Sequence, residues 1–532
     1  MKNSLFLYKR SIQIGSFILL FIISLIAIIA IALLSKSSFN NFFTLNKDEI
    51  YIIKFSIYQA LLSTLFSLII ATIFALLLSY QKRFFARGLI ISLISSSLVM
   101  PTIVISFGLI DIYGQRGFLK SIGIDIGEFY GLKGIVIAHV YLNSAYATKV
   151  LLSNLESIPL QKYKVATSLG FGAVKRFWYI EFIAIREALS SLFVTIFLLC
   201  FSSFAIILLL GGSPKYNTLE VSIYEAIRLD FDIPKALKYA SIQISIASFI
   251  TIFFSKRGAL LSNISANSYD LSFLKSKTLN FFHLLIIAIF SIFFISVLIS
   301  IFVSGFHADF KKILSDPLFL KALYISIFVA TISALFSIFF VYAISDLKRA
   351  FTLDLRAKEM RFSKLFEFII SLFSNIYLVV SSLILGLGFF IISVWSDLNQ
   401  TLMGYLALII SNILLTLPFG LSILYPKLLL SAKRYDKLAL SLGLSYSQYL
   451  RYIDLRIIKK DLIYIFTLSF CFSLGDLGVI SLFGSKDFTT LPWYLYSLLG
   501  SYQNSDANGV ALILLLLTML IFFTGERFAK DR

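Results

Sequence analysis

The chain has 532 residues, of which 59% are hydrophobic and only 14% are charged, and its mean hydropathy is +0.91. A single soluble core cannot bury so much apolar side chain, so the composition excludes an ordinary soluble domain and predicts a membrane protein. The formal net charge is +19, but the Lys and Arg residues lie between long apolar runs and form no basic stripe. We therefore expect the lipid bilayer as a partner and no nucleic acid.

The first apolar run follows a basic N-terminal segment that contains Lys2, Lys9 and Arg10. It extends from about residue 12 to residue 34, whereas the apolar core of a signal peptide has roughly 7–15 residues. A helix needs about 20 apolar residues to cross the hydrocarbon core of a bilayer. The sequence therefore predicts a first span that is retained.

Runs of spanning length recur along the rest of the chain, which predicts an all-α integral membrane protein with about twelve transmembrane helices. The expected spans cover residues 12–34, 56–80, 89–110, 133–153, 187–210, 236–254, 278–304, 319–345, 365–391, 402–425, 461–484 and 508–524. Met100 and Pro101 predict a kink in the third span, because proline cannot donate a backbone hydrogen bond. Val379 stands at the matching position of the ninth span, so a proline kink is not required in both halves.

The loops also carry information about topology. Most of the 47 Lys and Arg residues fall in loops that face the cytoplasm when the N-terminus is inside. This bias predicts an inner-membrane protein with both termini in the cytoplasm. The two cysteines, Cys200 and Cys471, both lie in apolar runs, so neither a disulfide framework nor a metal site is expected.

The sequence repeats itself at a shift of 273 residues. The segment Ala166–Gly170 reappears as Ala439–Gly443, and Ile180 reappears as Ile453. On the outer side, Gly211–Tyr224 resembles Gly484–Tyr496 at a shift of 272. Because six crossings return a chain to its starting side, both copies face the same side, as a parallel repeat requires. We predict two six-helix halves, residues 1–270 and 271–532, that enclose one path.

Each inner copy predicts a short helix, a glycine break and a second helix, within cytoplasmic loops at residues 154–185 and 427–459. Gly170 and Gly443 stand at the breaks, where we expect a positive φ or close packing. The small side chains of Ala166 and Ala439 are expected to let a partner approach the first helix of each loop.

The spacing of the two loops resembles the EAA loop of permease subunits in binding-protein-dependent ABC importers of type I. That signature reads Glu-Ala-Ala, three residues, Gly, nine residues, Ile, one residue, Leu-Pro, and both copies keep the distance from Gly to Ile. The match is partial, because the family's Glu and Pro positions hold other residues, namely Lys164 and Lys437, and Ile183 and Arg456.

The resemblance implies that these loops are coupling helices that seat in a groove of a separate ATP-binding cassette ATPase homodimer. It also implies a periplasmic substrate-binding protein. The coupling residues that it implies are Lys164, Ala166, Ser168, Leu169, Gly170 and Ile180, with Lys437, Ala439, Ser441, Leu442, Gly443 and Ile453. The chain contains no Gly-x-x-x-x-Gly-Lys-Ser/Thr motif, so ATP and Mg²⁺ are expected on the ATPase. A basic segment lying on anionic lipid is the alternative.

Fused double halves of this length resemble the branch of the family that includes thiamine and ferric-iron permeases. The likeness to thiamine permeases is densest in the segments Ser473–Ile480 and Phe488–Tyr502. It implies a non-enzymatic translocation subunit that imports thiamine or its phosphate esters by alternating access. Ferric iron is the alternative substrate, although the spans offer few hard oxygen ligands. An ion-coupled secondary transporter is the alternative from another class, although the spans are nearly free of charge.

Asp476 is the main candidate in the transport path. A carboxylate deep in a span costs roughly 2.5–3.5 kcal/mol on insertion, and it usually faces a cavity or a partner group. Asp476 is therefore expected either to attract a cationic substrate or to hold a neighbouring helix. The counterpart of Asp476 in the first half is Ser203. Gly475 and Gly478, which flank Asp476, would permit close helix packing or bending.

The outer segments form a second candidate site. They are expected to dock a binding protein or to gate the outer mouth through Glu220, Tyr224, Asp232, Thr490 and Tyr496. Anchoring of these segments in the interface by an aromatic belt is the alternative.

Overall fold

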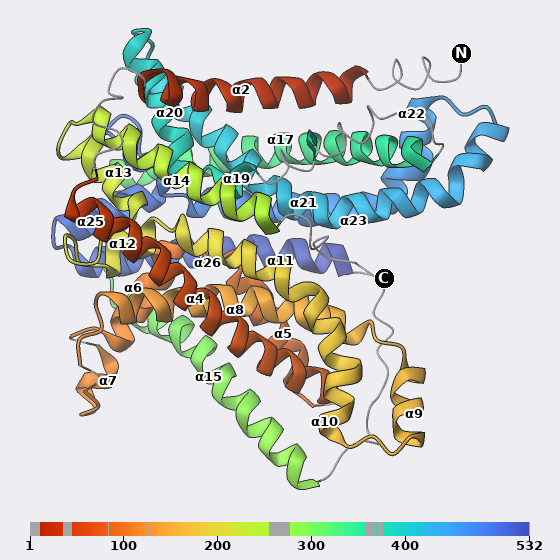
Figure 1. Ribbon diagram of the computed structural model, residues 1–532. Helices are drawn as coiled ribbons and strands as arrows, with labels where there is room; N and C mark the ends of the chain where they lie inside the picture. The colour runs from red at the N-terminus through yellow and green to blue at the C-terminus, as the bar shows by residue number, and fades with distance from the viewer. Residues whose placement is uncertain are drawn as a thin grey trace.

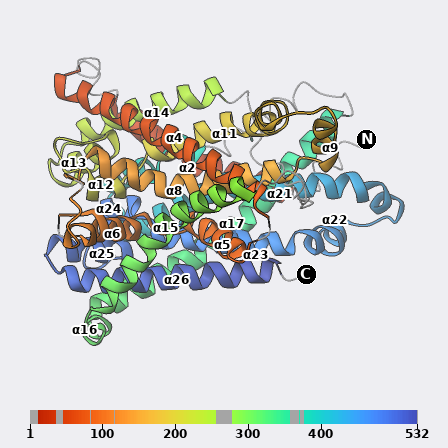
Figure 2. The same cartoon turned by 90° about the horizontal axis from the view of Figure 1, so that it is seen from below.

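The computed structural model describes residues 11–35, 45–82, 84–115, 117–125, 127–254, 277–356, 369–370 and 376–530. Within these ranges the chain is helical and contains no β-strand, so the all-α prediction is confirmed. Figures 1 and 2 show that most of the helices run along one long direction of the molecule.

The helices of the first half are α2 (Ser11–Ser35), α4 (Lys47–Tyr80), α5 (Arg87–Ser97), α6 (Thr102–Tyr113), α7 (Phe118–Ser121), α8 (Leu132–Glu156), α9 (Leu160–Ser168), α10 (Ala173–Arg176), the π-helical turn η2 (Phe177–Glu181), α11 (Phe182–Phe201), α12 (Ala205–Leu210), α13 (Leu219–Arg228) and α14 (Ile233–Phe254). Those of the second half are α15 (Lys277–Phe306), α16 (Phe310–Ser315), α17 (Pro317–Arg356), α19 (Ile376–Val379), α20 (Ser382–Trp395), α21 (Gln400–Ser441), α22 (Tyr446–Tyr449), the π-helical turn η5 (Leu450–Asp454), α23 (Leu455–Gly475), α24 (Gly478–Phe483), α25 (Leu491–Gly500) and α26 (Asn504–Lys530).

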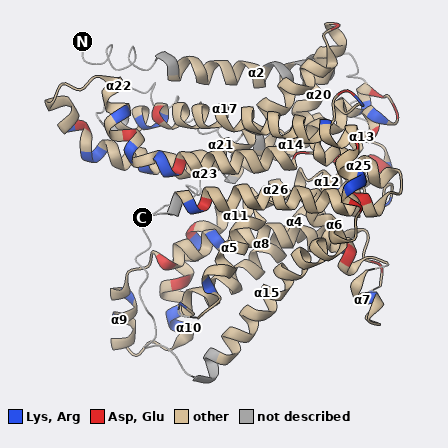
Figure 3. Ribbon diagram, turned by 180° about the vertical axis from the view of Figure 1, so that it is seen from behind, with Lys and Arg blue, Asp and Glu red and all other residues tan. Residues whose placement is uncertain are grey.

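In the described part of the chain, nine helices are long and apolar enough to cross a membrane. α5 and α6 together make one further broken span, bent by 115°, and α2 and α20 contain shorter apolar stretches. Charged residues gather at the two ends of the molecule and leave a largely uncharged belt between them (Figure 3). These features describe a multi-pass membrane protein, while the count of twelve spans stays a prediction.

The internal repeat is visible in the backbone as well as in the sequence. The π-helical turns η2 and η5 occupy positions related by the shift of 273. The amide of Leu219 donates to Ser56 Oγ at 3.0 Å, and the amide of Leu491 donates to Ser326 Oγ at 2.8 Å. These two bonds are equivalent, and each satisfies an N–H group that the start of a helix, α13 or α25, would otherwise leave unpaired.

The first helix of each half packs against the other half. α2 contacts α17 and α20 as well as α14 of its own half, whereas α15 contacts α4, α5 and α6 as well as α26 of its own half. In Figures 1 and 3, α2 and α15 lie on opposite flanks of the bundle. The predicted division near residue 270 therefore separates two repeats whose first helices are exchanged in space.

The fourth crossing of each half lies in the interior. About three quarters of the apolar stretches of α8 and α21 are buried (78% and 72%), against 33% for α14 and α15. Polar side chains on α8 bond to neighbouring helices: His139 Nδ1 lies 3.1 Å from Ser63 Oγ, and Asn143 donates to Cys200 Sγ at 3.3 Å. Such bonds join helices where no water is available.

The third span is interrupted at Pro101, as predicted, because α5 ends at Ser97 and α6 begins at Thr102. The second half is also interrupted at the matching place, although it has no proline there. There α19 ends at Val379 and α20 begins at Ser382, and Ser381 Oγ accepts the amide of Ile384 at 3.3 Å. A serine that caps the following helix can interrupt a span without proline, because its hydroxyl replaces a backbone acceptor.

Candidate coupling surface and translocation path

The repeated inner loops lie together at one end of the bundle. We call this end, which carries α9, α10 and α22, the coupling end, and we call the end with α13 and α25 the opposite end (Figure 2). Residues near both ends of the described chain lie at the coupling end. Gln13 donates a hydrogen bond to Tyr446 in α22, and Ser92 in α5 donates to Glu526 at 3.2 Å.

The two loops have the same backbone geometry. We call residues 160–181 the first coupling segment and residues 433–454 the second. Gly170 has φ +67° and Gly443 has φ +64°, which confirms the predicted left-handed turn at each break. The amide of Phe171 donates to the carbonyl of Ala166 at 2.9 Å, and the amide of Leu444 donates to that of Ala439 at 3.0 Å. This six-to-one bond and the following glycine turn make a Schellman-type end to each helix.

The exposed face of each coupling segment is apolar. Val165 and Leu169 are 57% and 66% exposed, and the equivalent Leu438 and Leu442 are 53% and 65% exposed. Residues four apart share one face of a helix, so each pair forms a short apolar stripe. Such a stripe is available for contact with a partner or with lipid. Four further predicted coupling residues are exposed as well, namely Lys164, Ser168, Lys437 and Ser441.

Two of the predicted contact residues lie on the buried side of their helices. Ala166 and Ala439 are buried, with 3% and 6% of their surface exposed, so they contact this chain and are not available to a partner. Their small size lets the first helix of each segment pack against its own bundle. Ile180 and Ile453 are half-buried in the π-helical turns, directly before two buried acidic residues.

The acidic residue of the first segment is Glu181, which is fully buried. The Tyr80 hydroxyl from the end of α4 donates to its carboxylate, and Arg176 Nε donates to it at 3.3 Å. The Arg176 guanidinium also lies over the Tyr80 ring, 5.5 Å from its centroid. The cation that compensates this carboxylate therefore comes from the coupling segment itself.

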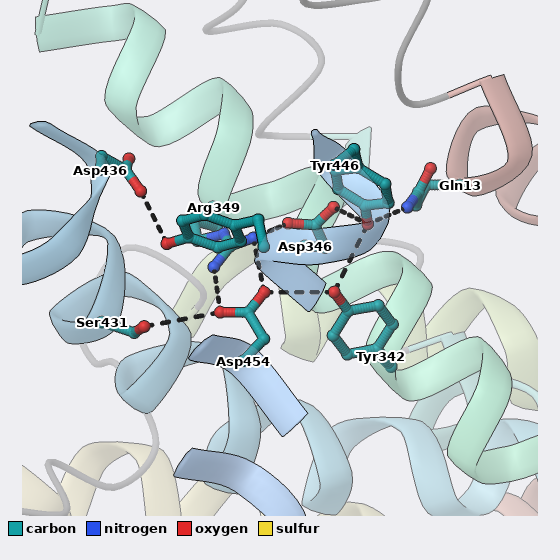
Figure 4. A network of polar contacts seen from close by, with 9 residues as sticks. Gln13, Tyr342, Asp346, Arg349, Ser431, Asp436, Tyr446 and Asp454 are labelled. Atoms are coloured by element: carbon teal, nitrogen blue, oxygen red, sulfur yellow. Dashed lines mark hydrogen bonds and ion pairs between the residues drawn. The ribbon is translucent and has the colours of Figure 1, made fainter. Parts of the chain in front are cut away.

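The acidic residue of the second segment is Asp454, which is also fully buried (Figure 4). Arg349 of α17 binds it with two hydrogen bonds of 3.0 Å each and also pairs with Asp346. Further hydroxyl and amide groups complete the network, with Tyr342 and Ser431 on Asp454, Tyr446 on Asp346, and Gln13 on Tyr446. The compensating cation here comes from a long membrane helix.

These clusters fix each segment to the bundle. Removing one partner of a buried ion pair typically costs 3–5 kcal/mol, because the other charge is left uncompensated. Sequence reasoning missed both carboxylates. The available signal was the acidic residue that directly follows Ile180 and Ile453 at the same repeat position.

Interruptions of three spans meet inside the bundle. A Cβ added to Gly475 would lie 3.1 Å from Pro101 Cα, and one added to Gly478 would overlap Ser382 Oγ. The break between α23 and α24 thus touches the breaks of the third and ninth spans. A side chain at Gly475 would crowd the backbone of Pro101, and one at Gly478 would displace the hydroxyl of Ser382, so glycine permits the close approach at both positions.

Asp476 lies at this junction. Its Oδ1 accepts the amide of Gly478 at 2.9 Å, so it caps α24, while its buried Oδ2 has no hydrogen-bond partner in the described part of the chain. This hydrogen bond is consistent with the structural interpretation of Asp476, and the contact of Asp476 with a substrate stays a prediction. Ser203 lies at the matching break, between α11 and α12.

The opposite end is closed by contacts between the two halves. The side chains of Tyr224 in α13 and Tyr496 in α25, which are equivalent in the repeat, lie close to each other. Arg228 donates to the carbonyl of Gly484 at 3.0 Å and lies over the Trp493 ring, 5.8 Å from its centroid. Phe204 packs edge-to-face on Tyr224, with 5.3 Å between the ring centroids.

No protein-family model matches the chain, but curated transport proteins do. It is 33% identical over 483 residues to the "Thiamine transport system permease protein ThiP" of Haemophilus influenzae, covering 89% of this chain and 87% of that protein. It is 31% identical to the ThiP of Brucella abortus and 30% identical to that of Escherichia coli, with 90% of this chain and 88% of each relative covered. The chain belongs to the thiamine transport system permease family.

The likeness covers both halves of the permease, because neither half is as long as 483 residues. A more distant match, 23% identity to the "Probable transport system permease protein NifC" of Clostridium pasteurianum, covers 37% of the permease and 70% of that protein. This match does not favour the ferric-iron alternative.

The predicted docking residues of the permease are mostly enclosed. Glu220, Tyr224 and Thr490 are buried, Tyr496 is half-buried, and Asp232 is exposed. Glu220 accepts a hydrogen bond from Gln243 of α14, and burial raises the pKa of its carboxyl to about 7. Of the five, Asp232 is exposed and Tyr496 is partly accessible, whereas Glu220, Tyr224 and Thr490 are not accessible to a docked protein in this conformation.

Proposed function

We propose that this permease is the membrane subunit of an ATP-driven importer that carries thiamine, or its phosphate esters, from the periplasm to the cytoplasm. The observation that supports the coupling role best is the pair of coupling segments, which have the same backbone geometry and the same exposed apolar stripe. Similarity to ThiP proteins over about nine tenths of the chain supports the substrate.

The coupling end would face the cytoplasm and bind an ATP-binding cassette ATPase homodimer. Each half of the dimer would receive one coupling segment, with Val165 and Leu169, or Leu438 and Leu442, in its groove. ATP and Mg²⁺ would be bound by the ATPase, and closure of its dimer would move the segments. The glycine breaks keep the two stripes in the same orientation, which suits a symmetric partner.

The transport path would run between the halves. The closed tyrosine contact at the opposite end separates the periplasm from the junction at Asp476. A periplasmic binding protein would deliver thiamine to the opposite end when that contact opens. The free Oδ2 of Asp476 offers a negative group to a cation that passes the junction.

Reconstitution tests the whole proposal. We expect proteoliposomes that contain the permease, the ATPase and the binding protein to take up thiamine only when ATP is present on the ATPase side. Thiamine phosphates and ferric iron serve as competing substrates. Uptake driven by an ion gradient without the ATPase would show instead that the protein is a secondary transporter.

Asp476→Asn separates the two roles of this residue. Asparagine retains an oxygen that can accept the Gly478 amide, so the cap on α24 is expected to persist, while the negative charge is lost. We expect insertion and ATPase binding to be unchanged and thiamine uptake to fall by about tenfold, as for loss of one charge-assisted contact. Ser203→Asn is the matched control at the equivalent break. Undiminished uptake by Asp476→Asn would leave Asp476 with a capping role alone.

A further inference from the structure

α2 reaches the second coupling segment directly, and α15 reaches Tyr80 of α4, which is bonded to the first coupling segment. Gln13, near the start of α2, is buried and donates to the Tyr446 hydroxyl of the second coupling segment. His283, near the start of α15, stacks on Tyr80 with ring centroids 5.8 Å apart and an angle of 17° between the planes. Gln13 and His283 differ by 270 in number, which is the shift that relates Ser56 to Ser326. Gln13 and His283 therefore occupy equivalent positions in the repeat, although their partners, Tyr446 of α22 and Tyr80 of α4, do not.

Each contact leads directly to a buried carboxylate. Tyr80 donates its hydroxyl to Glu181 of the first coupling segment. Tyr446 donates to Asp346 at 2.9 Å, Asp346 pairs with Arg349, and Arg349 binds Asp454 (Figure 4). α15 is thus joined to the first π-helical turn through the stack on Tyr80 and one hydrogen bond, and α2 is joined to the second through a chain of four polar contacts.

We propose that Gln13 and His283 are positioning residues of two crosswise latches that make the coupling segments move together. Displacement of the second segment by its ATPase subunit pulls on α2, which belongs to the first half, and displacement of the first segment pulls on α15, which belongs to the second. Buried polar contacts transmit such movements because breaking them leaves uncompensated groups in the protein interior. This inference rests on the coupling role proposed above.

The test uses the complete complex in proteoliposomes and measures thiamine taken up per ATP hydrolysed. We expect Gln13→Leu with His283→Leu to lower this ratio by about fivefold to tenfold, while ATPase binding and ATP hydrolysis persist, since only the link between the halves is lost. Tyr446→Phe removes the contact with Gln13 and also the donation to Asp346, so it should lower the ratio at least as much as Gln13→Leu, and adding Gln13→Leu to it should change nothing further. Leu19→Ala and Phe282→Leu change exposed positions on the same two helices and should leave the ratio unchanged. An unchanged ratio in the Gln13→Leu, His283→Leu variant would overturn the proposal.

A second measurement does not depend on transport. Gln13→Cys with Tyr446→Cys, in membranes without ATPase, should be joined by a short thiol cross-linker, whereas Leu19→Cys with Tyr446→Cys should not. Failure to cross-link the first pair overturns the latch even if uptake is normal. If the wild-type complex shows no ATP-dependent uptake, the proposed function fails, and the cross-link alone decides whether the latch exists.

Discussion

Replacing both Gly170 and Gly443 by valine is expected to abolish binding of the ATPase while the permease still inserts in the membrane. Both glycines have positive φ, near +65°, where an ordinary residue costs about 1–2 kcal/mol and a β-branched residue more. A Cβ at either position would meet no atom within 4 Å, so the effect comes from the backbone turn and not from a clash. We expect the affinity for the ATPase to fall about tenfold per segment and about a hundredfold in the double variant, measured by pull-down or binding in nanodiscs.

The chain offers a matched control in the same loop. Gly172 has φ −69° and ψ 171°, which any residue can adopt, and a Cβ there would also meet no atom within 4 Å. Its counterpart in the second half is Ser445, with φ −69° and ψ 161°. Gly172→Ser should therefore bind the ATPase with an affinity close to that of the wild type. If the Gly170→Val, Gly443→Val variant also bound the ATPase with an affinity close to that of the wild type, the segments would not be the coupling surface.

Joining Tyr224→Cys to Tyr496→Cys with a cleavable dithiol cross-linker is expected to stop uptake completely. The two tyrosines meet across the halves at the opposite end, and alternating access requires this contact to open in each cycle. A cross-linker about 8–10 Å long is preferred, because a direct disulfide needs Cα atoms within about 7 Å and tyrosine side chains reach further than that. Uptake in proteoliposomes should return when reductant cleaves the link.

The native cysteines do not interfere with this experiment. Cys200 and Cys471 are fully buried, and burial keeps a thiol protonated and unreactive. Each single-cysteine variant should keep its uptake after treatment with the reagent. Normal uptake by a fully cross-linked double variant would show that thiamine passes without separation of these two helices, and the gating interpretation would be wrong.

The repeat could be found from the sequence because both copies need the same unusual residues. A left-handed turn at the end of a helix selects glycine, so Gly170 and Gly443 mark the coupling segments without any structural information. The broken third span was likewise signalled by Pro101, since a missing N–H is a property of the residue itself. The break between α19 and α20 had no such signal in the sequence. Ser381 caps α20 only because the fold places the amide of Ile384 within reach of its hydroxyl.

Which face of a coupling helix meets a partner was not accessible from spacing alone. Ala166 and Val165 are neighbours in sequence, yet one is buried and the other exposed, and the packing of the segment on its own bundle decides between them. The same holds for the outer residues, since Glu220 and Asp232 are both acidic but only Asp232 is exposed.

Hydropathy, positive charge in the loops and the repeat spacing by themselves determined that this protein is a helical membrane protein with two related halves and a pair of glycine-ended coupling loops. These are local properties: a bilayer selects apolar runs of fixed length, and a turn selects its residue. Only the tertiary structure decided that α2 and α15 change places, that Glu181 and Asp454 are buried against Tyr80 and Arg349, and that Tyr224 meets Tyr496. Those contacts join residues that are far apart in the chain. Apolar helix surfaces resemble one another in sequence, so only the packing of the whole bundle determines which residues meet.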